Sequence, residues 1–98
     1  MNIEKKINDD SMLVILEGRL DTTTAPELEE SIISSIDGIK ELTFDFEKLE
    51  YISSAGLRVL LSAQKTMNKQ GSMKLINVGS AIREIFEVTG FVDILTIE

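Results

Sequence analysis

The chain has 98 residues, of which 43% are hydrophobic, and its 17 acidic and 10 basic residues give a formal net charge of -7. Length and apolar content predict one small domain with a single core. The acidic balance argues against nucleic acid or an anionic membrane surface as a direct partner, because both require clustered Lys and Arg. Since the chain has no histidine and no cysteine, Ser-His or Cys-His catalysis and the usual zinc sites are excluded. We expect neither a metal nor another cofactor.

The longest apolar run near the N-terminus is Met12 to Leu16. It is too short for a membrane span or for the core of a signal peptide. A chain without cysteine suits a reducing compartment. We therefore expect a cytoplasmic protein that does not insert into membranes, and a monomer as the simplest state for a small acidic domain.

The first half of the chain predicts two strands, a helix and a third strand. Asn2 to Ile7 and Met12 to Gly18 are typical of a hairpin. Because the second strand is uniformly apolar, we expect it at the centre of a sheet that is covered on both faces. The spacing from Thr24 to Glu27 fits a capping box, and Gly38 is expected as the C-cap of that helix. Leu42 to Phe46 alternates as a strand does.

The second half predicts an amphipathic helix that starts at Ala55 and ends at Gly71. A buried stripe and an exposed basic face are expected on it. The expected buried residues are Leu57, Leu60, Ala63 and Met67, and the exposed ones are Arg58, Ser62, Lys65 and Lys69. This face is either an ordinary solvated surface or a contact for an acidic patch on a partner.

After that helix, Ser72 to Val78 predicts a further strand, and Ser80 is expected to cap a third helix. Asp93 to Ile97 is expected as a short last strand. The resulting order is β-β-α-β-α-β-α-β. It predicts an α/β fold with a mixed sheet of four to five strands and crossover helices.

Asp21 and Ser54 each follow a predicted strand and precede a predicted helix. The carboxyl ends of parallel strands meet at one edge of a sheet, where ligands and partners tend to bind. We therefore expect these two residues to share that edge.

Ser54 is expected as the N-cap of the helix that follows it. A hydroxyl there lies among backbone N–H groups without intrahelical partners, at the positive end of the helix dipole, where a phosphate is well accommodated. Two interpretations follow: Ser54 only caps its helix, or it accepts a phosphate. An enzymatic role as a nucleophile is disfavoured, because the chain offers no histidine as a base.

The run from Asp45 to Leu61, Asp-Phe-Glu-Lys-Leu-Glu-Tyr-Ile-Ser-Ser-Ala-Gly-Leu-Arg-Val-Leu-Leu, resembles the signature of the STAS domain of bacterial anti-sigma factor antagonists. Gly18-Arg-Leu-Asp21 is similar to the Gly-Glu-Leu-Asp segment of that family. The resemblance covers nearly the whole chain and implies that Ser54 is the phosphorylated serine. Many members have Asp where this chain has Ser53, which makes Ser53 the alternative acceptor.

The resemblance also implies the partners. Family members bind an anti-sigma factor that is a serine kinase, and so release a sigma factor; phosphorylation ends the interaction and a serine phosphatase restores it. Together with the exposed helix face, it implies a set of partner-binding residues. They are Asp21, Thr22, Thr23, Ser53, Ser54, Ala55, Gly56, Arg58, Ser62 and Lys65.

The family leaves one alternative open. Some stand-alone STAS domains are accessory subunits of membrane lipid-transport complexes and dock on the ATPase subunit without a phosphorylation cycle. An interaction that vanishes when Ser54 is phosphorylated would favour the antagonist. Constant association with a transporter ATPase would favour the accessory subunit.

Overall fold

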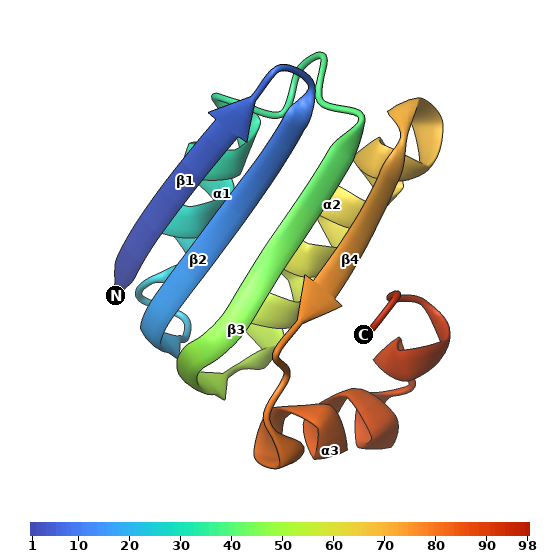
Figure 1. Cartoon of the computed structure of the whole chain (residues 1–98). Coiled ribbons are helices and arrows are strands. Elements are labelled where there is room, and N and C mark those ends of the chain that lie inside the picture. The colour runs from blue at the N-terminus through green and yellow to red at the C-terminus, as the bar shows by residue number, and fades with distance from the viewer.

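One mixed sheet of four strands forms the centre of the protein, and the computed structural model describes residues 1–98. The strands lie in the order of the chain (Figure 1). They are β1 (Asn2–Asn8), β2 (Ser11–Leu20), β3 (Glu41–Ile52) and β4 (Ser72–Ile76). β1 pairs antiparallel with β2, and the other neighbours are parallel. The predicted mixed α/β architecture with an initial hairpin is confirmed.

The helices are α1 (Ala25–Ile33), α2 (Ser54–Gln70) and α3 (Ser80–Thr89), followed by the short 3-10 helix η1 (Phe91–Asp93). Both α1 and α2 lie on one face of the sheet, whereas α3 lies beyond the carboxyl end of β4 (Figure 1). Successive parallel strands are added in one direction across the sheet. Right-handed crossovers therefore bring α1 and α2 to the same face.

Only one face of β2 is covered by helices, so the expectation of burial on both faces is wrong. Met12, Val14 and Leu16 are fully buried, whereas Leu13 and Ile15 between them are only half-buried. The strand is central in the sheet, as its composition indicates. Its second apolar row faces outward because no crossover reaches that side.

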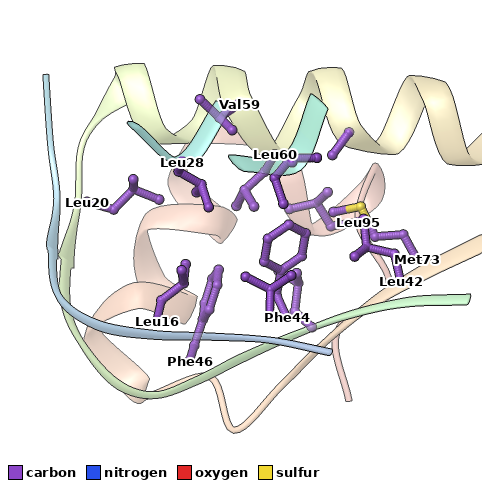
Figure 2. Close-up of a cluster of buried hydrophobic side chains, with 14 of the residues drawn as sticks. Leu16, Leu20, Leu28, Leu42, Phe44, Phe46, Val59, Leu60, Met73 and Leu95 are labelled. Atoms are coloured by element: carbon purple, nitrogen blue, oxygen red, sulfur yellow. The ribbon is translucent and has the colours of Figure 1, made fainter. Parts of the chain in front are cut away.

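The core fills the space between the sheet and the helices (Figure 2). Phe44 and Phe46 extend from β3, with ring centroids 6.2 Å apart. The ring of Phe86 lies 6.3 Å from Phe46 and connects α3 to the core. Other large side chains that are almost completely buried come from three strands and two helices: Met12, Leu16, Leu20, Leu28, Leu42, Leu60, Met67 and Leu75.

β3 is longer than the expected strand from Leu42 to Phe46, and two irregularities explain why. β3 gains one residue relative to β2 between Asp45 and Lys48, and a second between Leu49 and Tyr51. Its buried residues therefore change from a spacing of two to a spacing of three at Phe46, Leu49 and Ile52. Since bulges interrupt the alternation of side chains, the period-two pattern does not predict this half of the strand.

Two expected helix caps are wrong. α1 ends at Ile33 with Ser34 as its C-cap, and Gly38 lies in the turn beyond, where its φ of +83° suits glycine. Ser80 is the first residue of α3, and Gly79 occupies the N-cap position. The left-handed C-cap of α3 is Gly90.

The expected last strand from Asp93 to Ile97 is reduced to a single bridge. The chain turns through η1, places Leu95 in the core, and then pairs Ile97 with Leu75 of β4. Burial of Leu95 requires the tight turn, so only the final residues run beside β4.

Gly71 lies against the backbone of Lys40, the residue just before β3. It ends α2, as predicted, and a Cβ there would lie 2.6 Å from the carbonyl carbon of Lys40. We expect Gly71→Ala to lower the free energy of unfolding by about 1–3 kcal/mol, because the backbone of Lys40 must shift. Ser72→Ala, at the exposed neighbour, should change it by less than about 0.5 kcal/mol. Chemical denaturation measures both, and equal stabilities would contradict the close approach.

Candidate functional site

β2 and β3 remain paired up to the last residue of each strand, at their carboxyl ends. Leu20 pairs with Ile52, and the backbone N–H of Ser53 donates a hydrogen bond of 2.9 Å to the carbonyl of Leu20. Asp21 follows Leu20 and Ser54 follows Ser53, so the two loops lie side by side. The expectation that Asp21 and Ser54 share one edge of the sheet is confirmed.

The two serines have different positions at the start of α2. Ser53 is the N-cap, with an extended backbone (φ -99°, ψ 174°), and its Oγ accepts a hydrogen bond of 3.5 Å from the backbone N–H of Gly56. Ser54 is the first helical residue and is exposed. None of the side-chain hydrogen bonds of the protein involves its hydroxyl. The expectation that Ser54 caps the helix is therefore wrong by one residue.

The length of β3 explains why Ser53, and not Ser54, caps α2. The strand continues through Ile52 and is held by the Ser53–Leu20 hydrogen bond, which leaves Ser53 as the residue with extended backbone that a cap requires. Gly56 is buried, and a Cβ on it would lie 2.7 Å from Cγ of Leu20. Its place in the site is to let α2 approach β2 closely, while Ala55 remains half-buried at the surface.

Asp21 organises the loop that enters α1. Its Oδ1 accepts hydrogen bonds from the backbone N–H groups of Thr23 and Thr24, at 3.0 and 3.1 Å. These bonds form an Asx-type turn. The capping box expected from Thr24 to Glu27 is absent, because the Thr24 hydroxyl donates to the carbonyl of Arg19 at 2.8 Å and makes no cap bond to the helix.

The environment of Asp21 favours its charged form. The Thr24 backbone N–H lowers the pKa of this carboxyl most, partial desolvation opposes that shift, and the Thr23 N–H, the Thr24 hydroxyl and the Arg19 guanidinium lower it further. Arg19 also lies over the ring of Tyr51, with Cζ 4.3 Å from the centroid. This pair of neighbouring strand residues was not singled out from the sequence, although Arg19 stands where the family segment has Glu.

Several predicted partner-binding residues line one groove between α1 and α2. Thr22, Ala55 and Arg58 lie along it, together with α1 residues that the sequence did not indicate. These are Pro26, Glu29, Glu30 and Ile33. Ile33 is 66% exposed, and its position off the buried stripe of Leu28 and Ile32 is the signal that could have identified it.

The remaining predicted residues lie around this groove. Thr23 is exposed in the loop before α1, and Ser62 lines the continuation of the groove beside Ile33. Lys65 is exposed but lies outside both parts of the groove.

None of the helices is long and apolar enough to cross a bilayer.

The assignment of the cap to Ser53 predicts different effects at the two serines. Ser53→Ala should lower the free energy of unfolding by about 0.5–1 kcal/mol, because the Gly56 N–H loses its partner. Ser54→Ala should change it by less than about 0.5 kcal/mol, because no hydrogen bond is lost. Denaturant titrations of both variants measure the difference. A larger loss at Ser54 would contradict the assignment.

The lowered pKa of Asp21 predicts that the stability of the protein depends on pH. Its carboxyl has an ordinary pKa of 3.8, and the folded value is lower, so its stabilisation is complete above that pH and is lost as the pH falls through the folded pKa. We expect the stability difference between the wild type and Asp21→Asn to be largest above about pH 5 and to shrink below about pH 4. Unfolding curves across this range provide the measurement. A difference independent of pH would contradict the lowered pKa.

The protein-family model described as "STAS domain" matches residues 2–98. A protein named as an anti-sigma factor antagonist, BtrV of Bordetella bronchiseptica, is 34% identical over 91 residues, which cover 91% of this chain and 78% of BtrV. The anti-sigma-B factor antagonist of Bacillus subtilis is 31% identical over 98 residues, covering 99% of this chain and 90% of that protein.

Solved structures agree with the fold. An anti-sigma factor antagonist from Mycobacterium paratuberculosis has a TM-score of 0.88 and 25% identity, covering 98% of this chain and 83% of the other. SpoIIAA in its unphosphorylated form has a TM-score of 0.79 and 17% identity, covering 99% of this chain and 87% of that one. At that identity SpoIIAA supports the fold alone. The extent of the family match and the identity to the curated relatives show that the chain belongs to the STAS domain family of bacterial anti-sigma factor antagonists.

Proposed function

We propose that this protein is an anti-sigma factor antagonist that is controlled by phosphorylation at Ser54. Unmodified, it binds an anti-sigma factor that is also a serine kinase, and a sigma factor is thereby released. Phosphorylation by that kinase ends the interaction, and a serine phosphatase restores it. The protein acts in the cytoplasm as a binding protein and carries out no catalysis itself. Support for this role comes from the names of its relatives at 31–34% identity.

One observation carries the choice of Ser54. Its hydroxyl is exposed at the first position of α2, while Ser53 provides the cap. A kinase can therefore modify Ser54 without removing a hydrogen bond on which the helix depends. Modification of Ser53 would instead replace the group that accepts from Gly56, so we assign Ser54 as the acceptor and Ser53 as the cap.

The fold should tolerate the phosphate. It adds about -1.5 to -2 charges at pH 7, and at a helix N-terminus a negative charge is favourable by about 0.3–1 kcal/mol. A partner that packs over the same edge must desolvate this charge or leave it unpaired, which costs several kcal/mol. A penalty of roughly 3 kcal/mol weakens binding about a hundredfold. One modification can thus separate the bound from the free state.

Asp21 supports the switch as a neighbour of the acceptor. Two backbone N–H groups hold its carboxylate in place and keep it charged. A fixed negative charge beside Ser54 can orient the acceptor hydroxyl within a kinase complex, and it repels the phosphate once that has formed.

The binding surface in this proposal combines the two loops with the α1–α2 groove. Thr22, Ala55 and Arg58 line the groove, and the exposed Ile33 gives it an apolar contact. Protein interfaces have an apolar core and a polar rim, so Ile33 would lie at the core of this surface and the charged residues at its rim. Ser62 and Lys65 extend the surface along α2.

The decisive experiment compares wild type, Ser54→Ala and Ser53→Ala as baits in lysate of the native organism with ATP. All three should capture a serine kinase, and wild type should then gain a phosphate and release it. Ser54→Ala should hold the kinase unmodified. Ser53→Ala, the matched control, should still be phosphorylated. Quantitative phosphopeptide mass spectrometry and the bound fraction are the readouts. Constant association with a transport ATPase, with no phosphate on any variant, would contradict the proposal and favour the accessory-subunit role.

A further inference from the structure

We infer that Arg58 holds the phosphate on Ser54 in an ion pair within the same helix. The inference rests on the proposed function for the presence of that phosphate, and extends it to the structure of the modified state. It assigns to Arg58 a role as the residue that positions the phosphate, in addition to its place in the groove.

The spacing of the two residues makes the pair possible. Ser54 and Arg58 are both exposed and lie four residues apart on α2, where Cβ atoms are about 5–6 Å apart. Helical side chains lean toward the N-terminus, so Arg58 leans over the turn that carries Ser54. An acidic group that precedes a basic one by four residues has the favourable orientation for an ion pair.

Arg58 is free to make this contact. The three ion pairs of the protein join Lys6 to Glu4, Arg19 to Asp21 and Lys74 to Glu98. Arg58 takes part in none of them and in no side-chain hydrogen bond. Its planar guanidinium can donate two parallel hydrogen bonds to phosphate oxygens.

The other cations near this edge are less suitable. Arg19 is already placed over Tyr51 and beside Asp21. Lys65 is eleven residues beyond Ser54, about 16 Å along the helix axis at 1.5 Å per residue. Glu29 and Glu30 on α1 share the groove with Arg58, so Arg58 is the cation that lies between these carboxylates and the start of α2.

The pair has a consequence for the groove. Arg58 is the only basic residue among those that line it. When the phosphate draws the guanidinium toward Ser54, the groove keeps Glu29 and Glu30 and loses its positive charge. Phosphorylation therefore alters the proposed binding surface at the groove as well as at the edge of the sheet.

The test uses protein with phosphoserine placed at position 54 during translation, so that no native kinase is needed. The pKa of the phosphate is measured by 31P NMR titration in the wild-type background, in Arg58→Gln and in Lys69→Gln. Lys69 is the charge-matched control, because it is exposed on the same helix but about 22 Å along its axis from Ser54. That distance exceeds the Debye length of about 8 Å at physiological ionic strength.

We expect Arg58→Gln to raise the phosphate pKa by about 0.5–1 unit, because the nearby cation stabilises the dianion. Lys69→Gln should leave it within about 0.1 unit, since screening removes distant charges. Arg58→Lys should recover part of the shift, and the Arg58 Nε–H resonance should move on phosphorylation in the wild type and in Lys69→Gln alike. Equal phosphate pKa values in Arg58→Gln and Lys69→Gln, with an unmoved Nε–H resonance, would overturn the inference.

This outcome is separate from the fate of the proposed function. Arg58 can pair with a phosphate that was introduced artificially even if no kinase modifies Ser54 in the cell. Conversely, a kinase can modify Ser54 without the phosphate forming an ion pair with Arg58. The lysate experiment therefore decides the function, and the NMR titration decides the pair.

Discussion

The hydrogen bond from the Ser53 N–H to the Leu20 carbonyl closes the parallel ladder between β2 and β3. It fixes where β3 stops and therefore where α2 begins. Because the ladder continues past two bulges, the loop after β2 and the start of α2 emerge together at one edge of the sheet. The positions of the cap, the free serine and the carboxylate of Asp21 all depend on this pairing.

At that edge, the residues that stabilise the start of α2 are not the residue that we propose as the phosphate acceptor. Ser53 satisfies a backbone donor of α2, and Gly56 allows the helix to approach Leu20 closely. Ser54 contributes to neither task. A site that is to be modified reversibly benefits from this separation, because the free energy of the fold then changes little while the charge of the surface changes by nearly two units.

The surroundings of Ser54 are acidic, so an added phosphate would lie close to other negative charges. Asp21 is kept ionised by backbone donors, and Glu29 and Glu30 lie in the adjoining groove, within a chain whose net charge is -7. In the proposed switch, a phosphate at this acidic edge would meet repulsion from these carboxylates, which the helix N-terminus and Arg58 would oppose. In the proposed switch, a partner would therefore respond to the local balance of a few charges.

The order of the elements through α3 and most of the core could be predicted from the sequence alone, because hydrophobic periodicity reflects which face of an element is buried. It also indicated that Asp21 and the serines meet, since the ends of parallel strands share one edge. Which serine is the cap became clear from the three-dimensional arrangement of β2, β3 and α2. The bulges between Asp45 and Lys48 and between Leu49 and Tyr51 lengthen β3, and they depend on its register against β2, which no local pattern of side chains encodes.

The same holds for the groove and for the uncovered face of the sheet. Ile33 and Glu29 belong to the surface because α1 lies beside α2, and Leu13 and Ile15 face outward because both crossovers have the same hand. Periodicity describes an element against an average environment. It cannot specify which neighbour, if any, occupies the other side, because that is decided by how the whole chain is packed.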